Sequence, residues 1–239
     1  TEAMVDTIFA LTNPGDKIAM FSPYFENYRA QAIMAQCEPV FIPLVPPTFH
    51  FDPNVLEDAF KQGIKAILVC NPSNPSGKVF TYDELKLIAD LCIKYDVYAI
   101  MDEVYEHIIY DDNKHVYMNS LPGMWERTIT LNGFSKAFAM TGWRLGYACA
   151  PKPLMDVMLK IHQYTIMCAA TPSQHAAIEA LPELSGPDIL EIVRQREEIL
   201  RRLDRHGSLW LGHQKEPFVR LLQRILRVTP AMIKGYSEA

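Results

Sequence analysis

The chain has 239 residues, of which 49% are hydrophobic and 21% charged, a composition typical of a globular protein with one or two domains. This composition excludes a disordered, collagen-like or coiled-coil chain. The formal net charge is -5 and the pI about 5.8, so charge gives no reason to expect nucleic acid or an anionic membrane as a partner. No apolar run approaches the roughly 18 residues of a membrane span. A small soluble partner is expected.

The cysteines are odd in number, widely spaced and set among apolar residues: Cys37, Cys70, Cys92, Cys149 and Cys168. No CxxC pair and no His-rich ligand spacing accompanies them, so the sequence predicts no metal site. Such a set indicates buried free thiols in a reducing cytoplasm.

Helix and strand signals alternate over the first 150 residues. Residues 2–11 carry apolar positions at helical spacing and are followed by the breaker "NPGD". The next three elements are a strand at 17–22, a helix at 24–36 and a strand at 38–44. The chain does not begin with Met and starts inside this pattern, so we expect it to be part of a longer protein.

The alternation continues with a helix over 52–63 that Gly63 ends, and an apolar strand over 66–70. Thr81 and Glu84 form a capping-box pattern, which predicts a helix start. Two further buried strands are predicted at 97–102 and 128–132.

Helices that alternate with all-apolar strands indicate a parallel sheet covered on both faces. Ligands of such sheets bind at the carboxyl ends of the strands. Three polar segments follow predicted strands, and they are the candidates for a site: "NPSNPSG" after Cys70, "DEVY" after Met101 and "NGFSK" after Leu131.

Residues 151–181 predict one long helix and the start of another, and Pro182 to Pro187 interrupts the pattern. Residues 188–205 and 216–227 have helical, basic patterns. We therefore expect one domain over residues 1–181 and a separate helical segment over 182–239.

Asp102 ends an apolar strand, where a carboxylate must be compensated or used in chemistry. Tyr105 comes one turn later and shares its face if a helix begins there. Asn74 lies in a turn that Pro72, Pro75 and Gly77 restrain, so its amide is held in a fixed direction. Each residue also has a purely structural interpretation: a helix cap for Asp102, a half-buried core tyrosine, and an Asx turn.

Lys136 follows a strand and has apolar neighbours, which predicts a desolvated amine with a lowered pKa that can attack an aldehyde. Arg144 precedes "LGYACA", and a guanidinium at a strand end suits a phosphate. Together these groups indicate pyridoxal phosphate. The amine suits its aldehyde, the carboxylate its ring nitrogen, the guanidinium its phosphate, and Asn74 with Tyr105 its ring hydroxyl.

The segments "NPSNPSG", "DEVYEHIIY" and "NGFSKAFAMTGWRLGYACAPK" resemble the signature segments of the class I/II aminotransferases of pyridoxal phosphate fold type I, most closely the aspartate and aromatic branch. The resemblance runs from Thr1 to about Leu181. It implies a three-layer α/β/α large domain with a mostly parallel mixed sheet, followed by a truncated small domain.

The resemblance also implies a role for each residue. Lys136 matches the lysine that bonds the cofactor aldehyde and moves the α-proton, and Asp102 the partner of the pyridine nitrogen. Asn74 and Tyr105 match the residues that bond the phenolic oxygen. The remaining matches concern the phosphate and the ring face: Arg144 for the phosphate, Phe25 for stacking on the ring, and the backbone of Thr1, Glu2 and Ala3 for the phosphate at a helix start.

The function that follows from this resemblance is transfer of an amino group between an amino acid and a 2-oxo acid in a cytoplasmic homodimer. A C–S lyase and a non-catalytic relict or sensor domain of the same fold are the alternatives. Relatives have about a hundred residues before the position of Thr1, and residues 204–239 match no part of their small domain. No arginine is assigned to the substrate carboxylate, and we expect residues 1–239 alone to transaminate very little.

Overall fold

The computed structural model of the chain describes residues 1–181. The helices in this range are α1 (Glu2–Leu11), α2 (Asn27–Met34), α3 (Pro53–Lys61), α4 (Tyr82–Tyr95), α5 (Lys152–Thr165) and α6 (Thr171–Ala180). The strands are β1 (Lys17–Ser22), β2 (Glu38–Pro43), β3 (Ile64–Cys70), β4 (Tyr98–Asp102), β5 (Thr128–Gly133) and β6 (Gly146–Cys149). Short 3-10 helices are η1 (Met118–Ser120), η2 (Trp125–Arg127) and η3 (Thr141–Trp143).

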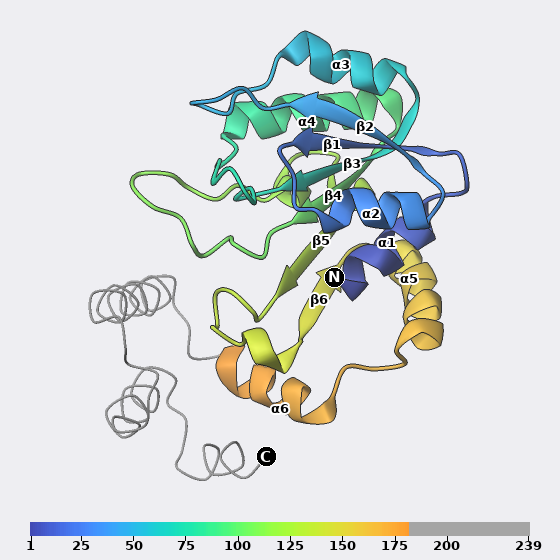
Figure 1. Ribbon diagram of the computed structural model, residues 1–239, viewed down its shortest axis with the longest axis vertical. Coiled ribbons are helices and arrows are strands. Elements are labelled where there is room, and N and C mark those ends of the chain that lie inside the picture. Colours follow the sequence, from blue (N-terminus) through green and yellow to red (C-terminus); the bar gives the residue numbers. More distant parts are fainter. Residues whose placement is uncertain (182–239) are drawn as a thin grey trace, which may run out of the picture. The chain divides into compact units, whose positions relative to one another are not determined.

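These strands form one sheet in the order β2-β1-β3-β4-β5-β6 (Figure 1). All neighbouring pairs are parallel except β5 with β6, which is antiparallel. The predicted mostly parallel mixed sheet is confirmed. Because β1 lies between β2 and β3, the chain reverses its direction across the sheet at β1, and ligands of open α/β sheets bind at such a reversal.

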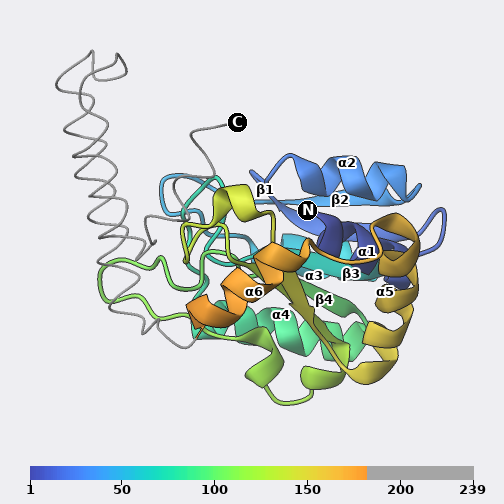
Figure 2. The same cartoon turned by 90° about the horizontal axis from the view of Figure 1, so that it is seen from below.

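An apolar core lies on each face of the sheet. Successive strand residues point to opposite faces, so β1 gives Ala19 and Phe21 to one core and Ile18 and Met20 to the other. Helices α3 and α4 pack on the first core, and α1, α2 and α5 on the second, where they lie beside one another (Figures 1 and 2). The three-layer α/β/α architecture is therefore confirmed.

Local signals fix the helix starts. Thr81 Oγ1 accepts a hydrogen bond of 3.2 Å from the Glu84 N–H, and the Glu84 carboxylate accepts one of 2.9 Å from the Thr81 N–H, as the capping-box pattern predicts. Asp52 caps α3 by accepting from the Asn54 N–H at 2.8 Å. A cap of this kind contributes about 1 kcal/mol to stability.

The prediction that all the cysteines are buried was wrong in part, and the helix considered after Asp102 is absent. All five cysteines are free, but only Cys37, Cys70 and Cys92 are buried, whereas Cys149 and Cys168 are exposed. No helix begins after Asp102, because residues 104–107 form turns closed by the Glu106 N–H bond to the Glu103 carbonyl.

The helices predicted over 188–205 and 216–227, and the separate segment 182–239, lie outside the described residues. Between residues 1 and 181, no helix combines the length and the hydropathy needed to cross a membrane.

Candidate active site

The three polar segments that follow β3, β4 and β5 meet at one edge of the sheet. Cys70 pairs with Asp102, and Asp102 with Leu131, across parallel strands. The ladder continues past the strands, since the Asn71 N–H donates to the Asp102 carbonyl and the Glu103 N–H to the Leu131 carbonyl, both at 2.9 Å. The carboxyl ends of adjacent strands therefore bring these segments together, as expected.

The Asp102 carboxyl group is held by hydrogen bonds from two other elements of the chain. The Tyr28 hydroxyl donates to Oδ2 at 2.6 Å, and the Val104 N–H to Oδ1 at 3.3 Å. Burial raises the pKa of Asp102 above its ordinary value, although both hydrogen bonds oppose the shift. A carboxyl group in this setting gains from a cationic or hydrogen-bond-donating ligand, and Asp102 does not cap a helix.

Tyr28 is a site residue that the sequence did not single out. It projects from α2, is 3% exposed, and burial raises the pKa of its hydroxyl far above the ordinary value, so the group remains a donor at physiological pH. Its ring meets that of Phe25 edge to face at 5.6 Å between centroids and 83°. One side chain thus positions both Asp102 and Phe25. The spacing of three residues between Phe25 and Tyr28 in a predicted helix was the available signal.

Lys136 lies next to Tyr105, with its Nζ 5.6 Å from the centroid of the tyrosine ring. The side chain of Lys136 is exposed, which contradicts the predicted apolar surroundings. The reason is that its apolar neighbours Phe134 and Ala137 are buried, while Lys136 points out of the loop. The Tyr105 hydroxyl makes no hydrogen bond within residues 1–181, and burial raises the pKa of Tyr105.

Asn74 occupies a tight turn after β3, as predicted. The Ser73 N–H donates to the Lys78 carbonyl and the Gly77 N–H to the Ser73 carbonyl, both at 2.8 Å, and Gly77 has a φ of +71°, which favours glycine. Asn74 and Tyr28 line the same pocket, which Cys70 and Ser73 also border. The turn therefore places Asn74 at the pocket that Tyr28, the hydrogen-bond partner of Asp102, also lines.

In the described part of the chain, Arg144 interacts with its own loop and not with the other predicted site residues. Its side chain is exposed, and its backbone is in the left-handed region with a φ of +50°. Its guanidinium donates a hydrogen bond of 2.7 Å to the Thr141 carbonyl of the same loop. Within residues 1–181, Arg144 makes no hydrogen bond or ion pair with Asp102, Tyr105 or Lys136.

The start of α1 provides free backbone donors. Thr1 is the N-cap residue, but its side chain makes no capping hydrogen bond to the first turn, which contains Glu2 and Ala3. The Thr1 carbonyl accepts from the buried Gln31 amide at 3.3 Å, which ties this end to α2. Free N–H groups at a helix start suit an anion such as phosphate.

The residues at the sheet edge fit pyridoxal phosphate by their chemistry. Neither the buried carboxyl group of Asp102 nor the Lys136 amine makes an ion pair among residues 1–181. The Tyr105 hydroxyl is likewise free of protein hydrogen bonds in this range. These groups, at the carboxyl edge of the sheet of an α/β protein, have the chemistry that suits a ligand with an aldehyde and an aromatic nitrogen.

Comparison with known proteins identifies the family. Residues 1–205 match the family "Aminotransferase class I and II". The chain therefore belongs to the class I and II aminotransferases. It is 42% identical over 216 residues to human kynurenine–oxoglutarate transaminase 3, an alignment that covers 81% of this chain and 48% of the relative.

Two further matches agree with this assignment. The aspartate aminotransferase of Musicola paradisiaca is 37% identical over 83% of this chain and 50% of the relative. The solved structure of N-succinyldiaminopimelate aminotransferase from Mycobacterium tuberculosis superposes with a TM-score of 0.77 at 30% identity, over 86% of this chain and 55% of that one. The chain spans about half the length of the curated relatives that it matches.

Proposed function

We propose that the protein is a pyridoxal phosphate-dependent aminotransferase that moves an amino group between an amino acid and a 2-oxo acid. The observation that carries this proposal is the arrangement at the sheet edge, where Lys136 lies over Tyr105 and the buried Asp102 is held by Tyr28. The names of the similar proteins support the same reaction type.

Pyridoxal phosphate supplies an aldehyde that bonds the amino group and a ring that accepts electrons from the α-carbon. Lys136 would hold the cofactor at its aldehyde, and its amine would serve as the general base for the α-proton of the substrate. Asp102 keeps a proton on the ring nitrogen, and Tyr28 holds the carboxyl group in position. A hydrogen bond to a charged group contributes on the order of 1.5–3 kcal/mol.

The remaining residues bind and orient the cofactor. Asn74 and Tyr105 donate to its phenolic oxygen, and Phe25 covers a face of the ring. The first backbone N–H groups of α1, at Glu2 and Ala3, and the Arg144 guanidinium bind its phosphate. In this role Arg144 turns away from the Thr141 carbonyl that it contacts here.

The proposed assembly is a cytoplasmic homodimer. Exposed apolar side chains gather on the described part of α5 and α6 and between them, among them Tyr164 at 88%, Met167 at 74% and Ile178 at 61% exposure. Apolar surface of this kind is typical of a face that another protein surface covers. The proposed amino acceptor is 2-oxoglutarate, because the human relative is named for that acceptor.

Trapping with borohydride tests the lysine assignment. The chain is incubated with pyridoxal phosphate, reduced and digested, and the modified peptide is identified by mass spectrometry. We expect one adduct, at Lys136, and none in Lys136→Ala. Lys78 is a suitable internal control, because its amine is paired with Glu84 at 2.7 Å and its side chain is 8% exposed. A main adduct at Lys78 or Lys152 would contradict the assignment.

A second assay, on the full-length protein because residues 1–239 alone are expected to transaminate very little, separates transfer from the alternatives. With an amino donor and 2-oxoglutarate, transfer produces glutamate, whereas a C–S lyase releases pyruvate and ammonia from a cysteine conjugate without an acceptor. A sensor domain binds the cofactor and produces neither. Formation of glutamate that requires Lys136 supports the proposal, and release of pyruvate alone contradicts it.

A further inference from the structure

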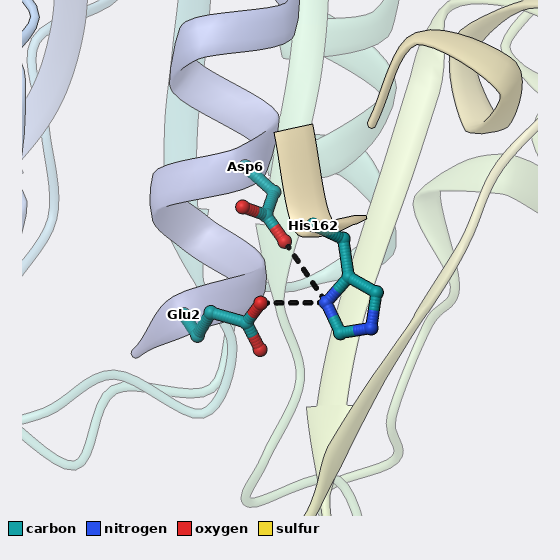
Figure 3. Close-up of side chains that lie close together, drawn as sticks. All are labelled: Glu2, Asp6 and His162. Carbon is teal, nitrogen blue, oxygen red and sulfur yellow. Dashed lines mark hydrogen bonds and ion pairs between the residues drawn. The ribbon is translucent and has the colours of Figure 1, made fainter. Parts of the chain in front are cut away.

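A second group of polar side chains joins α1 to α5; it includes the side chain of Glu2, whose backbone lies at the helix start described above. Glu2 and Asp6 lie four residues apart on α1 and so share a face, and His162 faces them from the last turn of α5. His162 Nδ1 is 2.6 Å from Glu2 Oε1 and 3.7 Å from Asp6 Oδ2. Figure 3 shows the two carboxylates directed toward the same ring nitrogen.

Asp6 carries an atom that this arrangement leaves unexplained. Its side chain is 5% exposed, and its Oδ1 is buried without a hydrogen-bond partner within residues 1–181. A buried carboxylate oxygen without a partner costs free energy, on the order of 1–3 kcal/mol or more.

The charges in this group do not balance. Among residues 1–181, His162 is the one basic side chain within ion-pair distance of Glu2 and Asp6. Thr165 adds a hydroxyl that donates to Glu2 Oε1 at 3.3 Å, which orients the carboxylate but brings no charge. Two carboxylates that share one imidazole leave negative charge for a cation to neutralise.

The distances also suit a metal ion. Zinc binds imidazole nitrogen and carboxylate oxygen at about 2.0–2.1 Å, so tetrahedral ligand atoms lie about 3.3 Å apart. The separations of 2.6 and 3.7 Å bracket that value, and shifts below about 1 Å would equalise them. Glu2 and His162 are 38% and 28% exposed, which provides a path for the ion and a position for solvent.

We propose that Glu2, Asp6 and His162 form a binding site for a divalent metal ion of the zinc class, with solvent as a further ligand. The ion fastens the start of α1 to the end of α5. Spacing in the sequence could not predict this site, because 155 residues lie between Asp6 and His162. This proposal does not depend on the proposed function.

A second group of similar composition provides the control. Glu103, Glu106 and His115 also lie within ligand distance of one another. The side chains of Glu103 and His115 are only 1% and 7% exposed, so an ion has less access to them than to Glu2 and His162. Glu106 Oε1 already accepts from the Asn132 amide at 2.6 Å. We therefore expect zinc at the first group and not at the second.

The test titrates zinc into the metal-free, untagged chain by isothermal titration calorimetry near pH 7.5. The exposed thiols are removed beforehand by Cys149→Ser and Cys168→Ser, since they also bind zinc. We expect one ion per chain and at least about a tenfold loss of affinity in Asp6→Asn and in His162→Gln. His115→Gln, in the buried group, is expected to leave the affinity unchanged.

A second measurement follows folding directly. Zinc should raise the melting temperature of the starting chain and not that of Asp6→Asn, because an ion that binds only the folded state stabilises it. Circular dichroism establishes whether each variant is folded. If His162→Gln does not fold, the nearly isosteric Asp6→Asn variant alone tests the metal-site proposal. No saturable binding, undiminished binding in Asp6→Asn, or loss of binding in His115→Gln would overturn the proposal.

Discussion

Asp102 and Lys136 follow neighbouring strands of one sheet, yet their side chains meet different surroundings. We call four residues the inner half of the site: Asp102, Tyr28, Phe25 and Asn74. Contacts among themselves and with the core fix them. Lys136 and Arg144, the outer half, are exposed, and Arg144 bonds its own loop. The inner half is therefore preorganised by this chain, whereas the outer half, under the proposed function, would have to be ordered by the cofactor.

The largest difference should appear in stability, between the core strand that carries Asp102 and the segment that carries Arg144. Ile100 lies on β4 beneath Asp102 and is fully buried, so Ile100→Ala should lower the free energy of unfolding by about 2–5 kcal/mol. Thr141→Ala in the exposed loop that precedes Arg144 should change it by less than about 0.5 kcal/mol. Urea denaturation followed by circular dichroism measures both. Equal losses would show that the outer loop is as firmly packed as the core.

The hydrogen bond inside the inner half should have the next largest effect. Tyr28→Phe keeps the ring against Phe25 but removes the donor to Asp102 Oδ2, which should cost about 1–3 kcal/mol of unfolding free energy. Tyr82→Phe is the matched control, because Tyr82 is 53% exposed at the start of α4. If both variants unfold at the same urea concentration, the bond from Tyr28 contributes nothing to stability.

The pH dependence of stability offers a finer comparison. The pKa of Asp102 is raised in the folded chain above its ordinary 3.8, so between these values the folded state binds more protons than the unfolded state. The stability that Asp102 contributes is present below pH 3.8 and is lost as pH rises through its folded pKa.

The difference in unfolding free energy between the starting chain and Asp102→Asn isolates this effect, because the other acids are common to both. As pH rises above about 4, the starting chain should lose stability relative to Asp102→Asn. A difference that is independent of pH would mean that Asp102 titrates in the fold as it does in the unfolded chain.

The smallest structural effect is expected at Arg144. Its side chain is exposed and makes one hydrogen bond, so Arg144→Ala should alter the free energy of unfolding by less than about 0.5 kcal/mol. Under the proposed function the same variant should bind pyridoxal phosphate at least about tenfold less tightly, since a charged hydrogen bond is lost. Absorbance titration with the cofactor measures this. A stable variant with undiminished affinity would remove Arg144 from the site.

The strands were predictable because their apolar runs are short and sharply bounded. "KIAMFS" predicts residues 17–22, and β1 is Lys17–Ser22. Asp102 and Asn74 were found in the same way, as the polar residues that follow buried strands. The order of the strands then placed both segments at one edge of the sheet.

The contact between Tyr28 and Asp102 was not predictable, because it joins residues 74 apart and exists only once α2 packs on the sheet. The exposure of Lys136 was missed for a related reason. Apolar neighbours in sequence indicate a buried loop, but the direction of one side chain in a loop depends on backbone angles that composition does not determine. The left-handed conformation of Ala139 in that loop is an example.

The distribution of the cysteines has a practical consequence. Three thiols are sealed in the interior, and burial raises the pKa of both Cys70 and Cys92 to about 12, so an alkylating reagent should not react with them in the folded protein. Cys149 and Cys168 are open to it, Cys149 more slowly because burial also raises its pKa. Intact mass measured over time would then report unfolding as the slow appearance of a third, fourth and fifth label, without any engineered probe.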